Sequence, residues 1–182
     1  MEPRDMNIPS GAPSFVPAVP VLQIIGYKNS GKTALVCRLI AALTAEGLRV
    51  GSAKHDAHDF RLDDLGTDSE KHLSHGAVET VLTSSTATRS MRKSSTSLDD
   101  IARQLVGKVD ILIAEGFKSA RHPKIALIRH DGDMEALPAQ AANIRLWISW
   151  EKPVGRTSPP TLWLKHEDSV LEAAVSLARS LL

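Results

Sequence analysis

One short stretch of this 182-residue sequence has residue types and spacing with an evident chemical use, and it reads GYKNSGKT at positions 26–33. The pattern is G-x-x-x-x-G-K-T, with Gly26, Gly31, Lys32 and Thr33 at the defining positions. Glycines let the backbone turn tightly around a phosphate. Successive backbone N–H groups and the positive end of the following helix then stabilise the charge of that phosphate. The lysine reaches the β- and γ-phosphates and the threonine hydroxyl binds Mg²⁺. The stretch therefore predicts a loop that holds a nucleoside triphosphate.

A phosphate-bound metal ion also needs a carboxylate nearby, and the apolar run VDILIAEG at 109–116 offers two. Phosphate sites lie at the carboxyl ends of parallel strands, so Glu115 is at the right end of this run and Asp110 at the wrong one. We predict that Glu115 positions the metal ion or a water molecule, with Lys32 as its catalytic companion. The other interpretation of Glu115 is a charge at a strand's solvated end.

Metal ligands and nucleotide contacts follow from these two motifs. Asp68, in the first turn of an expected helix, is a further Mg²⁺ candidate, although a first-turn acid is also favoured by the helix dipole alone. The predicted metal ligands are Thr33, Asp68 and Glu115. The predicted nucleotide-binding residues are Gly26, Tyr27, Lys28, Asn29, Ser30, Gly31, Lys32, Thr33 and Ala34.

The elements that must position these residues alternate along the chain. VLQIIG at 21–26 is an apolar run ending at glycine, which indicates a buried strand, and apolar residues recur at helical spacing through 32–46. Such alternation argues for an α/β fold with a mainly parallel sheet and helices on both faces. Further strands are expected at 48–54, 109–116, 124–130 and 144–150, a β-hairpin at 77–85 and 88–93, and helices at 67–75, 97–106 and 167–182. We interpret 151–162 as a loop.

Composition limits the classes of partner. A net charge of +1 with scattered basic residues gives no electrostatic case for nucleic acid or a membrane surface, and no apolar run is long enough to span a bilayer. Cys37 is the only cysteine, so no disulfide forms within the chain, and we expect a reducing, cytoplasmic location. The proline-containing residues 1–19 are interpreted as a mobile tail, and residues 20–182 as one domain.

Three further motifs follow the phosphate loop: AKHDAHDF at 53–60, D-x-x-G-x-D-S at 63–69, and AEGFK at 114–118 with PKI at 123–125. Their order and spacing resemble the MobB family, the accessory protein of molybdopterin guanine dinucleotide biosynthesis, over roughly residues 20–130. The resemblance implies a P-loop NTPase-type α/β fold, a homodimer, binding of GTP and Mg²⁺, and at most weak GTP hydrolysis. It also implies work beside the guanylyltransferase MobA, with molybdopterin and molybdoenzyme maturation proteins as further candidate partners.

The resemblance also assigns polar residues after the second strand and after the apolar strand to the ligand pocket. One departure concerns a His-His pair that family members often have before an aspartate, because here Ala57 precedes His58. A role that needs both imidazoles is therefore in doubt. The candidates carried over for the pocket are Lys54, His55, Asp59, Asp63, Ser69, Gly116 and Lys118.

Several alternatives stay open at this point. Lys118 either holds a substrate phosphate or pairs with a carboxylate. Arg89 and Arg92 are interpreted as exposed hairpin residues, and the alternative is that they contact a phosphate. The three tryptophans (147, 150 and 163) are interpreted as core or interface residues and not as a platform for a nucleobase. No Asn/Thr-Lys-x-Asp box is present, so guanine preference rests on the resemblance. A small-molecule kinase and a non-catalytic molybdopterin carrier are the competing functions.

Overall fold

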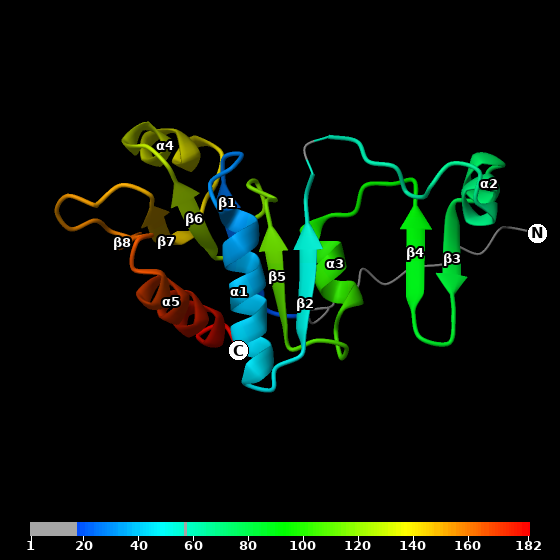
Figure 1. The fold of residues 1–182 in the computed structure, drawn as a ribbon, viewed down its shortest axis with the longest axis horizontal. Helices are drawn as coiled ribbons and strands as arrows, with labels where there is room; N and C mark the ends of the chain where they lie inside the picture. The colour runs from blue at the N-terminus through cyan, green and yellow to red at the C-terminus, as the bar shows by residue number, and fades with distance from the viewer. Residues whose placement is uncertain (1–17, 57) are drawn as a thin grey trace, which may run out of the picture.

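The computed structural model describes residues 18–56 and 58–182, and a six-stranded sheet organises them (Figure 1). Most of the predicted tail lies outside the described residues, although Val19, its last residue, is buried against Ala102 of α3. The strands are β1 (Val21–Gly26), β2 (Val50–Lys54), β3 (Glu79–Thr83), β4 (Thr88–Arg92), β5 (Ile111–Glu115), β6 (Lys124–Ile128), β7 (Ile144–Ser149) and β8 (Thr161–Trp163). The helices are α1 (Lys32–Ala45), α2 (Asp68–Ser74), α3 (Leu98–Gln104), α4 (Asp131–Ala136), the 3-10 helix η1 (Leu137–Ala139) and α5 (Glu167–Arg179).

The sheet has the strand order β2-β5-β1-β6-β7-β8, and every pairing in it is parallel. β1 is central and its six residues are all buried, as expected for a strand covered on both faces. Because the strands are parallel, their carboxyl ends share one edge, which carries the loop between β1 and α1 (Figure 1). This arrangement confirms the predicted P-loop NTPase-type fold.

Helices cover both faces of the sheet. α1 and α5 pack on one face, where Leu22, Ile24 and Leu39 belong to the largest apolar cluster. The opposite face is covered in two places, by α3 against β5 and by α4 with η1 against β6 and β7. Successive residues of β1 point to opposite faces, so Ile24 packs under α1 while Ile25 packs under η1. The core therefore fixes β1, and with it the start of the phosphate loop.

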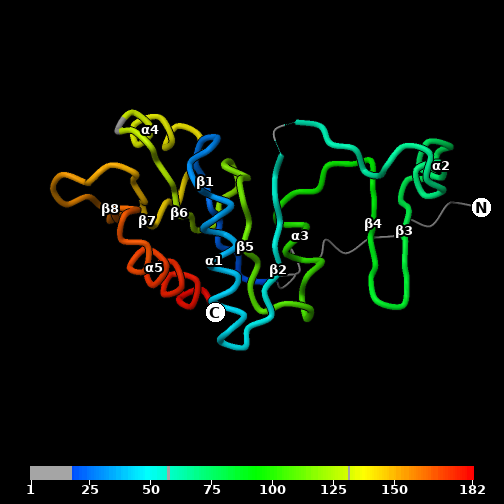
Figure 2. The backbone as a smooth tube through the Cα atoms, in the orientation of Figure 1, coloured from blue at the N-terminus to red at the C-terminus, as the bar shows by residue number. Residues whose placement is uncertain are grey.

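A β-hairpin of β3 and β4 stands apart from the main sheet, beside α2 (Figure 1). Two chain segments lead to it, one leaving β2 and one returning to α3, as the backbone trace shows (Figure 2). Thr67 caps α2 by accepting a hydrogen bond from the Glu70 N–H, which is the cap predicted from the Thr67–Glu70 spacing. The hairpin predicted at 77–85 and 88–93 is also confirmed, with shorter strands.

Two elements differ from the sequence-based expectation. The segment 151–162, interpreted as a loop, contains the start of β8, which pairs in parallel with β7 and forms the sheet's edge. The short helix α4 was not predicted, because it has only six residues and no helical repeat of apolar positions. Its first turn is held by the Asp133 carboxylate, which accepts hydrogen bonds from the backbone N–H groups of Arg129 and His130.

Candidate nucleotide-binding site

The loop between β1 and α1 depends on backbone conformations that favour glycine. Gly26 has a φ of 153°, and a side-chain carbon there would lie 2.5 Å from the Leu127 carbonyl oxygen. Gly31 has a φ of 94° and is the residue from which α1 begins. Asn29 lies between them in the left-handed region, with a φ of 61°. These turns bring the loop over the N-terminus of α1, where free N–H groups favour an anion.

The ammonium group of Lys32 points into the loop, where it donates a hydrogen bond of 2.6 Å to the Tyr27 carbonyl oxygen. Burial lowers the pKa of Lys32 from its usual 10.5; Glu115 opposes the shift, while the charges of Lys118 and Lys54 add to it. Lys54 and Lys118 therefore lie near enough to Lys32 to act on its charge, beside the Glu115 carboxylate. Such a cluster is suited to a ligand with several negative charges, such as a triphosphate.

Glu115, at the end of β5, is buried and directly faces the phosphate loop. The Thr33 hydroxyl lies 3.0 Å from both Glu115 carboxylate oxygens, and the Lys54 ammonium lies 3.8 Å from one of them. A hydroxyl and a carboxylate at this separation are oxygen donors of the kind that Mg²⁺ binds together with phosphate oxygens and water. The predicted pair of Thr33 and Glu115 is thus brought together, and its donor set fits Mg²⁺.

The backbone after β5 folds back over the end of β1 and carries Lys118 to the phosphate loop. The Lys118 ammonium lies 4.3 Å from the centre of the Tyr27 ring. The side chain of Gln23 holds this turn by donating hydrogen bonds to the carbonyl oxygens of Gly116 and Phe117, at 3.0 and 2.7 Å. Gln23 was not predicted, although a polar residue inside the apolar run 21–26 is the signal that could have indicated it.

The polar residues after β2 line a groove beside this turn. The His55 ring packs 5.2 Å from the Phe117 ring, and its backbone N–H donates to the Glu115 carbonyl oxygen at 3.0 Å. At Gly116 a side-chain carbon would lie 3.2 Å from the His55 carbonyl oxygen, so the two turns are in close contact. Lys54, His55 and Asp59 line a groove of ≈ 630 Å³ that continues to Arg92 and Lys93.

Three residues of the D-x-x-G-x-D-S motif lie in a different place. The Asp63 carboxylate accepts hydrogen bonds from the hydroxyls of Ser69 and Thr67 and forms an ion pair with Arg89 at 3.1 Å. The hydrogen bond from Ser69 is the main cause of the lowered pKa of Asp63. Asp68 is exposed on α2 and pairs with Lys71 at 3.1 Å. Because α2 lies beyond the hairpin (Figure 1), the structure does not bring Asp68 to Thr33 within one chain. The motif instead braces the hairpin.

Trp150, at the end of β7, contacts the phosphate loop directly. Its indole Nε1 donates a hydrogen bond of 2.9 Å to the carbonyl oxygen of Ser30, yet 46% of the residue's surface is exposed. Of the tryptophans interpreted as core or interface residues, Trp147, which is 5% exposed, belongs to the core, and Trp150 does not. Sequence could not separate the two, because both follow an apolar strand pattern and only the sheet register decides which is covered.

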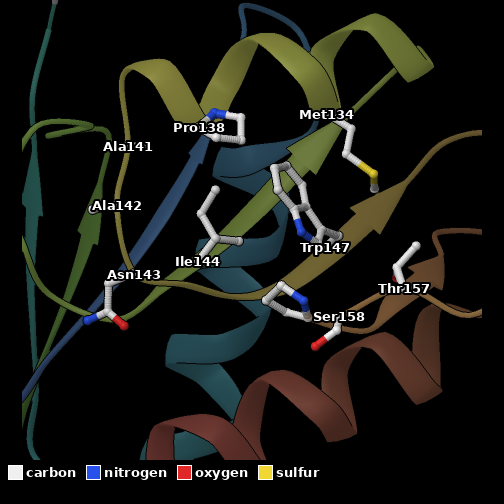
Figure 3. Close-up of a pocket in the computed structure, with 10 residues that line it drawn as sticks. Met134, Pro138, Ala141, Ala142, Asn143, Ile144, Trp147, Thr157 and Ser158 are labelled. Atoms are coloured by element: carbon white, nitrogen blue, oxygen red, sulfur yellow. The ribbon is translucent and has the colours of Figure 1, made fainter.

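A second hollow lies away from these residues. It measures ≈ 620 Å³ and is lined by Ile144, Trp147, Ser158 and their neighbours, on the face of β7 that α4 covers (Figure 3). Ile144 begins β7, so this part of the hollow lies at the opposite end of the strand from the phosphate loop. Among residues 18–56 and 58–182, no three histidine, cysteine or acidic side chains gather as metal ligands. No helix in these ranges is long and apolar enough to cross a bilayer.

Comparison with known proteins places this site in a family. The family described as "Molybdopterin guanine dinucleotide synthesis protein B" matches residues 21–150. A Bacillus subtilis protein named as a probable molybdopterin-guanine dinucleotide biosynthesis adapter protein is 29% identical over 161 residues, covering 85% of this chain and 90% of its own. The Escherichia coli adapter protein is 34% identical over 116 residues, covering 61% and 66%.

Solved structures agree with the sequence matches. The crystal structure of a MobB homologue from Bacillus stearothermophilus has a TM-score of 0.70 and 31% identity, covering 88% of this chain and 98% of that one. Bacillus subtilis MobB has the same fold, with a TM-score of 0.74 at 24% identity, covering 86% and 96%. The family match spans the phosphate loop, Glu115 and Trp150. The chain belongs to the MobB family.

Proposed function

We propose that this protein is a GTP-binding accessory protein of molybdopterin guanine dinucleotide biosynthesis, which binds GTP with Mg²⁺ and assists the guanylyltransferase MobA. The observation that carries the proposal is the contact of Thr33 with both carboxylate oxygens of Glu115, beside the Lys32 ammonium. Adapter proteins of this pathway are named among its relatives, which supports the pathway. Guanine as the base is inferred from the family.

Each residue then has a defined part in binding. The backbone N–H groups of residues 26–33 surround the β-phosphate, and Lys32 exchanges its bond to the Tyr27 carbonyl for phosphate oxygens. Thr33 and Glu115 would hold Mg²⁺, which would neutralise charge on the phosphates. Lys54 lies beside Glu115 and Lys118 lies beside Tyr27, and both add positive charge to the site.

We expect hydrolysis by the isolated protein to be slow. Fast GTP hydrolysis needs a positioned water and an added cation at the γ-phosphate, commonly an arginine. The hairpin arginines do not meet this need in one chain, because Arg89 binds Asp63 and Arg92 binds Glu79. A partner or a second copy would have to supply that cation. Turnover of tens per second by the purified protein would contradict this part of the proposal.

We also propose that the protein acts as a homodimer in the cytoplasm. The hairpin region exposes large apolar side chains, with Val78 84%, Val81 56% and Leu82 51% exposed, and such patches mark interaction surfaces. Sedimentation velocity should report a dimer for the wild type and a monomer for Leu82→Asp. Val154→Asp, at a 96% exposed position in the loop between β7 and β8, is the matched control and should stay dimeric.

The test of the function is reconstitution with purified guanylyltransferase, molybdopterin and limiting GTP. We expect added wild-type protein to increase formation of the guanine dinucleotide, and Lys32→Ala to lose that increase. Lys108→Ala, an exposed turn residue at the opposite end of β5, should behave as the wild type. Equal product formation with and without the wild-type protein would refute the accessory role.

A further inference from the structure

The position of Glu115 sets the direction in which a bound triphosphate must run. Glu115 and Lys54 lie at the ends of β5 and β2, on one side of the central strand β1. A Mg²⁺ ion held by Thr33 and Glu115 would neutralise charge on the terminal phosphates, so this side would take the terminal phosphate if the proposed function holds. The α-phosphate and nucleoside must then leave toward the other side of β1, where β6, β7 and β8 end.

On that side, one aromatic side chain lies against the phosphate loop. Trp150 donates from its indole Nε1 to the Ser30 carbonyl oxygen at 2.9 Å, which joins the end of β7 to the loop. Its own carbonyl oxygen accepts a hydrogen bond of 3.1 Å from the indole of Trp163, at the end of β8. Hydrogen bonds therefore hold both the side chain and the backbone of Trp150, beside the part of the loop from which the α-phosphate would leave.

Trp150 is nevertheless almost half exposed, and the groups around it are cationic. The Arg129 guanidinium lies 5.1 Å from the Trp150 ring centre, and the Lys165 ammonium lies 5.0 Å from the ring centre of Trp163. A partly exposed indole held in place is a surface on which a planar base can stack, and the guanidinium over the ring adds positive charge there. The aromatic residue of the loop itself, Tyr27, is instead packed against the apolar cluster at η1 and lies 4.3 Å from the Lys118 ammonium.

We propose that the ends of β6, β7 and β8 form a nucleobase subsite for a purine nucleoside triphosphate, with Trp150 as the wall against which the base stacks. The inference rests on the proposed function, because it takes the direction of the nucleotide from the phosphate loop. It adds the residues that meet the base, which the phosphate loop itself does not contact. Arg129, whose guanidinium lies over the Trp150 ring, contributes positive charge to this subsite.

Inorganic triphosphate separates the base from the phosphates in a binding test. Calorimetry with Mg²⁺ should compare GTP and inorganic triphosphate for the wild type, Trp150→Ala and Trp150→Phe. We expect Trp150→Ala to weaken GTP binding roughly 5- to 100-fold, as for loss of one stacked base, and to leave triphosphate binding within about 2-fold. Trp150→Phe keeps a stacking face without the indole N–H, and should recover most of the GTP affinity.

Three other results would overturn the subsite at Trp150. An equal loss of GTP and triphosphate binding in Trp150→Ala would mean that Trp150 only holds Ser30, and would overturn the subsite. Phe60→Ala removes an exposed aromatic on the β2 side and should leave both ligands unaffected, whereas loss of GTP binding there would reverse the direction we infer. A wild type that binds neither ligand would refute the proposed function itself, and with it this inference.

Discussion

At the scale of single residues, Gly26 decides whether the phosphate loop can form. A side chain at this position would meet two atoms, the Leu127 carbonyl oxygen at 2.5 Å and the Ser30 hydroxyl at 2.6 Å. The first is backbone of a buried strand and cannot move without disturbing β6. Gly47, after α1, also has a positive φ of 88° but has no atom within 4 Å of the added carbon. Gly26 is therefore required both by its backbone conformation and by the lack of space for a side chain, whereas Gly47 is required by its conformation alone.

Gly26→Ala should cost about 1–3 kcal/mol more in unfolding free energy than Gly47→Ala, because it adds overpacking to the same kind of backbone strain. Urea unfolding of both variants measures the difference. Equal destabilisation by the two substitutions would show that the contact with Leu127 is relieved without cost, and would contradict this reading of the loop.

Lys124 is the other residue whose chemistry depends on its position. It is fully buried at the start of β6, and its ammonium donates to the carbonyl oxygens of Ala120 and His122. Burial lowers its pKa from 10.5 to about 8. The unfolded chain therefore binds more protons than the folded one between pH 8 and 10.5, so stability rises with pH in that window.

We predict that Lys124→Met removes this rise. The unfolding free energy of the wild type, relative to the variant, should increase by about 2 kcal/mol between pH 7.5 and pH 10. Denaturant unfolding of both proteins across this range gives the difference, in which other titrating groups cancel. A constant difference would mean that the Lys124 ammonium loses its proton at the same pH in both states.

At the scale of elements, the hairpin of β3 and β4 is held by side chains and not by the main sheet. Arg89 on β4 reaches Asp63 and the Leu62 carbonyl oxygen, and Lys93 donates to the Leu73 carbonyl oxygen at 3.1 Å. Both acceptor segments lie in or next to α2. The hairpin and α2 therefore form a unit that can loosen without opening the sheet.

Arg89→Ala should loosen that unit alone. We expect amide exchange in β3, β4 and α2 to become roughly tenfold faster, because the Asp63 carboxylate loses its charged partner, while β1 and β5 keep their protection. Hydrogen exchange with mass spectrometry resolves the two regions. Arg103→Ala breaks only an exposed pair within α3 and serves as control; faster exchange in β1 after Arg89→Ala would show that the hairpin is part of the core's cooperative unit.

Sequence predicted the elements that have a strong repeat and missed those that do not. The apolar run of β1, the helical repeat of α1 and the cap at Thr67 each carry a local signal, and all three are found. β8 has three residues whose pairing with β7 is decided by tertiary packing. The position of α2 also depends on packing, since nothing near Asp68 in sequence indicates that the helix docks on the hairpin.

At the scale of the whole molecule, strand order turns separate motifs into one site. Glu115 is 82 residues from Thr33 in sequence, yet β5 lies beside β1 and places their side chains 3.0 Å apart. That pairing follows from two predictable facts, a parallel sheet and a carboxylate at a strand's end. The role of Trp150 does not follow from them, because the neighbour order β1-β6-β7 cannot be derived from the sequence pattern.

We propose that the phosphate loop holds GTP with Mg²⁺, and calorimetry can test this by comparing two nucleotides and two proteins. GTP and ATP, each with Mg²⁺, are titrated into the wild type and into Lys32→Ala. We expect the wild type to bind GTP more tightly than ATP, and Lys32→Ala to lose this binding because the β- and γ-phosphates lose their cation. Equal or tighter binding of ATP, or GTP binding that survives Lys32→Ala, would contradict it.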